Sequence, residues 1–352
     1  MDAISIEILS PDRFEEYGRF LLSAPRHLIY ASLPYMSFLS RVVPGQARYY
    51  LATQGNAIVG AMPAFEMVHP RLGYVSNSLP WYGSHGGILA FQEPVVAALA
   101  DAFLRHIRSQ NLLSATIIGS LFDDENNAAL LKRHLDVFTT DSRIGQLTSL
   151  PEAGEDIGDR LLQDVFTQKT RNLVRKSFAQ GFEMSRADDD ASWNFLFQTH
   201  RENLTTIGGR YKPQEHFLAI RETFPPDMRT LWIASHQGRP VAALLLLLYN
   251  RTVEYFTPAV SHEYRSRQPL SFLIHHAMID AVKNGFQRWN WGGTWLNQKS
   301  LYHFKKGLGA RDYPYRYYII TNPAGLSRMK ENKNLLLDAF PNYYLFPLNQ
   351  LT

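Results

Sequence analysis

The residues best suited to chemistry lie in one stretch of the sequence, residues 292–310, directly after a short aromatic strand. The stretch opens with two glycines and then carries Tyr302, Phe304, Lys305 and Lys306. Glycines let the backbone turn close to a ligand, and a fixed cation stabilises negative charge that develops during a reaction. The pattern favours a binding or catalytic role, and the alternative is a core phenylalanine followed by two surface lysines.

The sequence excludes several other kinds of chemistry. The chain has no Cys, which excludes disulfides, thiolate zinc sites and cysteine nucleophiles. It also lacks the G-x-S-x-G, H-E-x-x-H, P-loop and G-x-G-x-x-G motifs. His275 and His276 are adjacent on a predicted helix and point to different faces, which makes them poor joint metal ligands. We expect no metal site and no permanently bound cofactor.

The length and composition of the chain predict a two-domain globular protein. It has 352 residues, of which 45% are hydrophobic and 19% are charged. The N-terminus carries acidic residues and lacks the apolar region of a signal peptide. The longest apolar run, residues 241–249, is too short to cross a bilayer and predicts a buried strand. We therefore expect a cytoplasmic protein.

Charge is unevenly distributed along the chain. Residues 1–160 hold 12 Lys and Arg against 17 Asp and Glu, whereas residues 161–352 hold 24 against 15. Three of the cations, Lys169, Arg171 and Arg175, lie within two turns of a predicted helix. Such a basic half is suited to an anion such as phosphate, nucleic acid or an anionic lipid surface, and the alternative is a solvated basic face.

The chain contains a weak internal repeat. Each copy has a predicted hairpin, an aromatic stretch, a helix and a further strand, with chance similarity as the alternative. The segments are 50–68, 73–87, 94–109 and 114–120 in the first copy, and 232–250, 253–269, 270–285 and 287–293 in the second. In the second copy, strict alternation places Glu254 and Phe256 on one face of a strand and Tyr255 and Thr257 on the other.

In this order the motifs resemble the FemAB-like branch of the GNAT acyltransferase superfamily, particularly the BioF2-like or cellulose-biosynthesis-type acetyltransferases. The resemblance covers nearly the whole chain and rests on residues 60–87, 169–184, 253–293 and 300–310. It implies an α/β (α+β) fold of two GNAT-like domains packed side by side, each a mixed, mostly antiparallel sheet flanked by helices. We expect an N-terminal domain over 1–155, a C-terminal domain with the basic cleft over 156–325, and an aromatic tail over 326–352.

The resemblance implies acyl transfer to an amine, and it leaves two donors to compare. Peptidoglycan-bridge enzymes use aminoacyl-tRNA, whereas ordinary GNAT enzymes hold the CoA pyrophosphate on a glycine-containing loop at a helix N-terminus. The corresponding residues 265–272 contain no glycine: Gln268 and Leu270 stand at the glycine positions, and Pro269 lacks a backbone N–H. This loop is poorly suited to CoA, so we expect aminoacyl-tRNA as co-substrate, with acyl-CoA as the alternative.

The resemblance also implies site residues. The stretch 300–307 is similar to the Fem-like Tyr-x-Phe-Lys motif, which implies catalytic roles for Tyr302, for Phe304 as a wall of the acyl channel, and for Lys305 as a fixed cation. The substrate itself helps to deprotonate the amine, so no dedicated carboxylate base is required. The expected substrate contacts are Trp81, Tyr82, His85, Lys169, Arg171, Asn172, Arg175, Arg201, Tyr255 and Arg265. For His85, a satisfied loop histidine is the favoured alternative.

Together these features predict a FemAB-like N-acyltransferase of cell-envelope biosynthesis. It would act on the amine of a nucleotide-linked, lipid-linked or saccharide precursor. An acyl-CoA-dependent acetyltransferase of cell-surface polysaccharide biosynthesis and a non-catalytic ligand-binding GNAT pair are the alternatives. The sequence leaves open whether the protein also binds tRNA and whether it contacts a membrane peripherally. The aromatic segment 332–352 is expected to dock on the body of the protein rather than on a membrane.

Overall fold

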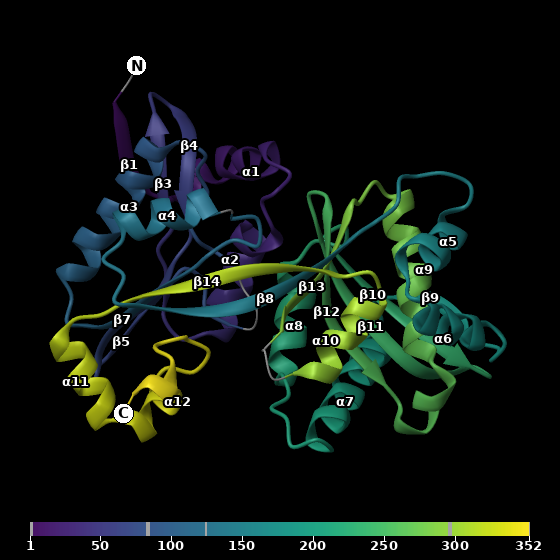
Figure 1. Cartoon of the computed structure of the whole chain (residues 1–352). Helices are drawn as coiled ribbons and strands as arrows, with labels where there is room; N and C mark the ends of the chain where they lie inside the picture. Colours follow the sequence, from purple (N-terminus) through teal and green to yellow (C-terminus); the bar gives the residue numbers. More distant parts are fainter. Residues whose placement is uncertain (1–2, 82–84, 124, 295–297, 352) are drawn as a thin grey trace. The chain divides into compact units, whose positions relative to one another are not determined.

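The computed structural model of the chain describes residues 3–81, 85–123, 125–294 and 298–351 (Figure 1). Tyr82, one of the expected substrate contacts, lies outside these residues. Among the described helices, none is both long enough and apolar enough to cross a membrane.

The chain forms two compact units, and strands β8 (Thr139–Ser149) and β14 (Arg311–Ile320) carry it from one to the other. The first unit comprises residues 1–143 and 314–352, and the second comprises residues 144–313. This division differs from the expected domains, because the chain returns to the first unit after residue 313 instead of ending in a separate tail.

The first unit contains two sheets. Strands β1 (Ile4–Ile8), β3 (Tyr50–Gln54) and β4 (Ala57–Met62) form an antiparallel sheet in the order β1-β3-β4. The second sheet has the order β2-β5-β6-β7-β14, where the further strands are β2 (Gln46–Ala47), β5 (Phe65–His69), β6 (Gly73–Asn77) and β7 (Leu112–Ile118). Pro63 lies between β4 and β5 and has no N–H for a strand ladder, which explains why this segment divides between two sheets.

The helices of the first unit cover these sheets, and α3 (Glu93–Arg108) is the longest of those described. Its apolar residues recur at three- and four-residue spacing and pack on β1, β3, β4 and β7. The other helices are α1 (Phe14–Ser23), α2 (Leu33–Val42), α4 (Glu125–His134), α11 (Pro323–Glu331) and α12 (Leu336–Ala339).

The C-terminal aromatic segment docks on the first unit, which confirms that expectation. The side-chain amide of Asn77 donates to the Tyr344 carbonyl at 2.8 Å, and its oxygen accepts from the Tyr344 N–H at 2.7 Å. The Thr116 hydroxyl also donates to the Tyr344 carbonyl, at 3.1 Å. Buried polar side chains of β6 and β7 are thus satisfied by the end of the chain.

The second unit is one mixed sheet in the order β8-β13-β12-β11-β10-β9, with helices packed against it. All neighbouring strands are antiparallel except β12 and β13, which are parallel. The strands are β9 (Glu183–Ala187), β10 (Arg229–His236), β11 (Arg239–Tyr249), β12 (Thr252–Val260) and β13 (Arg288–Thr294). The apolar run 241–249 lies in β11 and is mostly buried, as predicted.

Two groups of helices cover this sheet (Figure 1). The apolar side chains of α9 (Pro269–Lys283) share one core with β10, β11, β12, β13 and with α6 (Gln168–Phe178). Helix α7 (Asp190–Thr205) packs against β11 and β12, and its buried side chains lie outside that core. The remaining helices are α5 (Ile157–Arg160), α8 (Gln214–Thr223) and α10 (Lys299–Gly307).

The predicted repeat is confirmed in the order of its elements. In the first unit β6 leads through α3 to the parallel strand β7, and in the second unit β12 leads through α9 to the parallel strand β13. A hairpin precedes each, β3–β4 in one unit and β10–β11 in the other. Mixed, mostly antiparallel sheets flanked by helices are therefore present in both units.

Candidate functional site

Strands β12 and β13 separate soon after they begin, and this split is the centre of the candidate site. The two strands pair over three residues only, from Thr252 with Arg288 to Glu254 with Asn290. Strand β12 continues to Val260, and no pairing with β13 is present among the described residues beyond Glu254. Past this point the two strands no longer pair with each other, which opens the sheet at this position.

A β-bulge in β12 determines which side chains flank the split. The pairing with β11 passes from Leu246 opposite Tyr255 to Leu245 opposite Thr257, so Phe256 is the inserted residue. Adjacent residues of β11 point to opposite faces, and therefore Tyr255 and Thr257 do too. The prediction that they share a face is wrong, because strict alternation does not allow for an inserted residue.

On the face covered by α9, aromatic side chains line the end of the split. The ring of Tyr255 lies 4.8 Å from that of Trp291, and Phe304 contacts Trp291 edge-on at 6.1 Å. Burial raises the pKa of Tyr255, so its hydroxyl is protonated at neutral pH. Phe304 itself is partly exposed, at 37%. These rings form an apolar wall that is suited to an acyl chain.

Lys305 lies behind this wall and is buried. Only 3% of the residue is exposed. Its Nζ donates to the Thr294 hydroxyl at 2.8 Å and to the carbonyls of Gly293 and Gly292 at 3.2 and 3.4 Å. Burial lowers the pKa of Lys305 to about 8. The alternative of a surface lysine is wrong for Lys305, because α10 folds this side chain back onto the end of β13.

Hydrogen bonds link Lys305 to Tyr302 through polar side chains. The Thr294 hydroxyl donates to Gln146 Oε1 at 2.8 Å, and Gln146 Nε2 donates to Asp312 Oδ1 at 3.4 Å. The Tyr302 hydroxyl donates to Asp312 Oδ2 at 2.7 Å, and this bond raises the tyrosine pKa. The network also reaches Lys306, whose Nζ lies 3.6 Å from Asp312.

The opposite face of the split carries polar residues that the sequence analysis did not select. Glu254 and Asn290 are neighbours in the register and are 2% and 0% exposed. The Asn290 side-chain oxygen accepts from the Gly292 N–H at 2.9 Å. Further along this face, Lys212 donates from Nζ to the Thr257 hydroxyl at 3.1 Å. An acidic residue in an apolar strand was the one available signal, whereas Lys212 comes from a loop with no motif.

The structure does not bring the predicted basic residues to the split. Lys169, Asn172 and Arg175 are exposed on α6, and Arg265 is exposed just before α9. Arg171 is bonded to the side chain and carbonyl of Gln163 at 2.6 and 3.2 Å. Arg201 is exposed on α7, with its guanidinium 5.6 Å from the ring of Phe197.

The N-terminus of α9, where ordinary GNAT enzymes bind pyrophosphate, is closed by side chains. Gln268 has a left-handed backbone with φ of 66° and donates from Nε2 to the Arg265 carbonyl at 3.1 Å. Its Oε1 accepts from the Ser271 hydroxyl, also at 3.1 Å. Arg267 is bonded to Gln180 and to His236. The side chains of Arg267 and Gln268 at this turn are therefore engaged in hydrogen bonds.

The two described candidates of the first unit, Trp81 and His85, are both buried. Trp81 is 6% exposed, has a φ of 80° and contacts Phe38 edge-on at 4.9 Å. His85 is 4% exposed and lies between the rings of Tyr30 and Tyr315, at 5.5 and 4.5 Å. Burial lowers the pKa of His85 to about 4, so the ring is neutral at pH 7.

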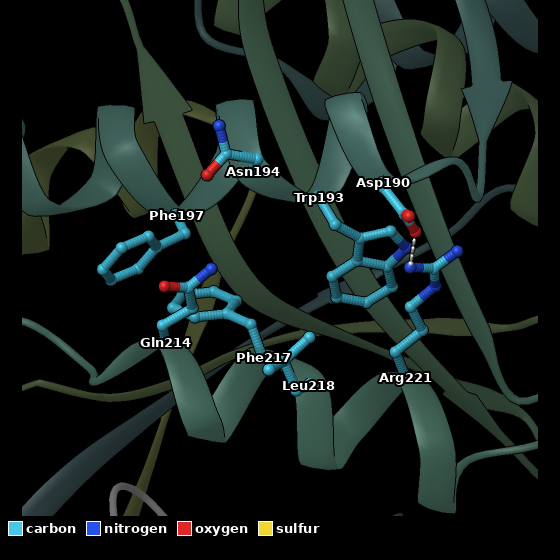
Figure 2. Close-up of a pocket in the computed structure, with 8 residues that line it drawn as sticks. All are labelled: Asp190, Trp193, Asn194, Phe197, Gln214, Phe217, Leu218 and Arg221. Atoms are coloured by element: carbon cyan, nitrogen blue, oxygen red, sulfur yellow. Dashed lines mark hydrogen bonds and ion pairs between the residues drawn. The ribbon is translucent and has the colours of Figure 1, made fainter.

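A separate cavity of about 320 Å³ lies between α7 and α8. Figure 2 shows Trp193 and Phe197 of α7 facing Phe217 of α8, with the ion pair between Asp190 and Arg221 at one end. None of the predicted site residues lines this cavity. Among the described residues, no group of three His, Asp or Glu side chains is placed to hold a metal ion.

Comparison with known proteins gives one family match and several matches to solved structures. Residues 165–329 match the family model of the acetyltransferase (GNAT) domain. No curated protein matches the chain.

The chain is similar to several solved structures at low sequence identity. FemX has a TM-score of 0.73 at 13% identity, over 90% of this chain and 97% of its own. The C-terminal domain of a proposed lysylphosphatidylglycerol synthetase from Agrobacterium fabrum has a TM-score of 0.58 at 12% identity, over 92% and 96%. A tandem GNAT protein from the clavulanic acid biosynthesis pathway has a TM-score of 0.53 at 12% identity, over 90% and 98%. The fold is therefore a tandem GNAT fold, which is consistent with the FemAB-like branch.

Proposed function

We propose that this chain, whose residues 165–329 match the acetyltransferase (GNAT) domain, is an N-acyltransferase with its reaction centre at the split between β12 and β13. One observation carries the proposal. The strands part at Glu254 and Asn290, so that a buried carboxylate flanks the split on one face and an aromatic wall with a buried lysine flanks it on the other.

The reaction requires a neutral amine and an activated acyl group. The amine nitrogen attacks the acyl carbon, a C–N bond forms, and the C–O bond of an aminoacyl ester or the C–S bond of a thioester breaks. We assign the proton lost by the amine to the Glu254 carboxylate, and the released oxygen or sulfur takes up a proton. This assignment replaces the expectation that no carboxylate base takes part.

The three residues of the Tyr-x-Phe-Lys run receive different roles. Phe304 forms the acyl wall together with Tyr255 and Trp291. Lys305 fixes the end of β13, and its charge stabilises the oxyanion that develops on the carbonyl oxygen of the acyl group. Tyr302 acts through Asp312, which orients the network that ends at Lys305.

For the donor we propose aminoacyl-tRNA, and acyl-CoA is the second candidate. The closed N-terminus of α9 and the exposed cations of α6 support the first. Lys169, Asn172, Arg175 and Arg265 would then bind the nucleic acid backbone, to which exposed cations are suited. The match to an acetyltransferase domain favours acyl-CoA, the co-substrate of GNAT acyltransferases.

For the acceptor we propose an amine on a lipid-linked, nucleotide-linked or saccharide precursor of the cell envelope. The similar structures support this class, because the name lysylphosphatidylglycerol synthetase describes attachment of a lysyl group to a lipid. If the donor is acyl-CoA, the corresponding reaction is acetylation of a cell-surface polysaccharide precursor.

The test offers the purified chain a panel of amine acceptors with either charged tRNA or acetyl-CoA and identifies products by mass spectrometry. We expect product with charged tRNA, whereas product with acetyl-CoA alone would select the second candidate. Glu254→Gln should lower kcat by about 100-fold or more, and Glu263→Gln on the exposed turn before α9 should leave it unchanged. Ligand binding without product from either donor would show a non-catalytic pair and contradict the proposal.

A further inference from the structure

Lys212 lies in the connection between α7 and α8, yet its ammonium is held over β12. Its backbone N–H donates to His200 Nε2 at 3.2 Å, and its Nζ donates to the Thr257 hydroxyl at 3.1 Å. Two hydrogen bonds of 2.9 and 3.1 Å between Asn203 and the backbone of Val260 hold the last turn of α7 against the end of the same strand. The fold therefore places this cation beside the split.

On this face Lys212 lies beside Thr257, whereas the cation Arg229, opposite Leu247 on β10, is paired with Asp188. Burial lowers the pKa of Lys212 to about 8, so the ammonium is still the main form at pH 7. Burial and the nearby lysine charge lower the pKa of His200 to about 4. Burial also lowers the pKa of His216, which has Glu215 beside it. The two histidines are thus neutral at pH 7, and part of the Lys212 residue is exposed to solvent.

Glu254 and Lys212 are arranged as a pair of opposite charges on one face. Glu254 lies opposite Leu247, and Thr257, which holds Lys212, lies opposite Leu245. Leu245 and Leu247 are two residues apart along β11, so the positions of Thr257 and Glu254 are separated by about 7 Å along the sheet. This spacing follows from the bulge at Phe256, since without it Thr257 would point to the other face. A ligand that fits between the two groups has an amine toward Glu254 and an anion toward Lys212.

We infer that Lys212 binds the carboxylate of the acceptor, and that the acceptor carries an α-amino acid head, either free or as the end of a larger precursor. In such a head the amine and the carboxylate share one carbon, so both can reach their partners at once. The inference rests on the proposed function, because it takes the amine at Glu254 to be the attacking group. It narrows the acceptor to one chemical class.

The test compares amino acids with their carboxamides as acceptors, using the full chain and whichever donor gives product. A mixture of the common amino acids and a matched mixture of their amides are the probes. Lys212→Met should raise KM for the amino acids by about 10- to 100-fold, as loss of one charged hydrogen bond does, with kcat little changed. KM for the amides should not change, and Lys212→Arg should restore amino acid use. Lys283→Met, at the exposed end of α9, is the control.

Equal effects of Lys212→Met on amino acids and amides would overturn the inference. Thr257→Val is a second variant that keeps the lysine and removes its hydroxyl partner, and it should also raise KM for the amino acids selectively. If Lys212→Met does not fold, Thr257→Val decides the question by the same comparison.

Calorimetry with the same amino acids separates this inference from the proposed function. Wild-type protein should bind them and Lys212→Met should not, whether or not product forms. Binding without turnover would contradict the proposed function and support the carboxylate site. Turnover of amines without any preference for a neighbouring carboxylate would support the function and overturn the site.

Discussion

At the scale of single residues, Lys305 combines a structural and a chemical role. A buried ammonium is stable only where protein groups replace its water, and here two backbone carbonyls and a threonine hydroxyl do so. The same bonds fix Gly292 and Gly293 at the end of β13. Removing the Lys305 ammonium should therefore also change the conformation of the turn that it holds.

Lys305→Ala should lower both stability and activity. The substitution leaves buried acceptors without a donor, which should reduce the free energy of unfolding by about 1–3 kcal/mol. Loss of a charge-stabilising donor should lower kcat by about one to three orders of magnitude. Urea denaturation and turnover assays measure the two effects.

Lys306→Ala is the matched control, because the Lys306 side chain is 39% exposed. Its Nζ lies 3.6 Å from Asp312, at the surface of the network. Its effect on stability should stay within about 0.5 kcal/mol. If the Lys305 variant keeps wild-type turnover and stability while the Lys306 variant does not, the roles assigned to the two lysines are reversed.

The lowered pKa of Lys305 predicts a dependence of stability on pH. The pKa is about 8 in the folded chain against an ordinary value of 10.5, so between these values the unfolded state binds more protons. Stability should therefore rise as pH rises through this range, by up to about 3 kcal/mol from this group. Below pH 8 the cost of the buried charge is fully present.

Lys305→Met isolates this contribution, because Lys212 titrates equally in both proteins. The free energy of unfolding should rise more steeply between pH 8 and 10 in the wild type than in the variant. Parallel curves from denaturant titrations across this range would show that Lys305 keeps its ordinary pKa.

At the scale of elements, the turn before α9 supports the proposed choice of donor. Gln268 spans this turn, with one hydrogen bond to the Arg265 carbonyl and one from Ser271. A pyrophosphate at a helix N-terminus needs free backbone N–H groups and close approach. Here Pro269 lacks the N–H and the glutamine side chain lies across the turn.

Arg265→Ala should leave the affinity for CoA unchanged, because the proposed function places no CoA pyrophosphate at this turn. Calorimetric titration of CoA into the wild type and the variant measures this, with Lys283→Ala at the other end of α9 as the control. Tight CoA binding that is lost in the Arg265 variant alone would overturn the assignment.

Regular elements were predictable from the sequence where local pattern decides them. Apolar spacing from Leu270 to Val282, with Gly285 after the end, predicted a helix, and α9 covers Pro269–Lys283. The bulge at Phe256 was not predictable, because it depends on the register with β11 and leaves no local signal. Lys212 was missed for the same kind of reason, since its position follows from how α7 is tied to β12.

At the scale of the whole molecule, the chain leaves its first unit and returns to it. Local patterns could predict the two copies, but not that residues 314–352 complete the first one. The distribution of charge also depends on how the chain divides into units. The second unit holds 21 Lys and Arg against 17 Asp and Glu, and the first unit holds 15 Lys and Arg against 15 Asp and Glu. The strong contrast between the two halves of the sequence is weaker in the folded units.

The return of the chain makes the first unit depend on its last residues. Tyr343, Leu345, Phe346 and Leu351 are buried, and the backbone of Tyr344 binds both ends of the Asn77 side chain. Ending the chain at residue 341 exposes this surface and leaves Asn77 and Thr116 without their partner. Strands β6 and β7 should then lose protection against hydrogen exchange, because their buried polar groups are unsatisfied.

Hydrogen exchange followed by mass spectrometry should show this loss in β6 and β7, while β10, β11 and β12 keep their protection because they belong to the second unit. Asn334→Ala is the matched control, since this exposed residue lies in the same C-terminal segment and its loss should change exchange in neither unit. Equal protection of β6 and β7 in the full and shortened chains would mean that the first unit folds without the tail. Its contacts with Asn77 would then be a consequence of folding rather than a condition for it.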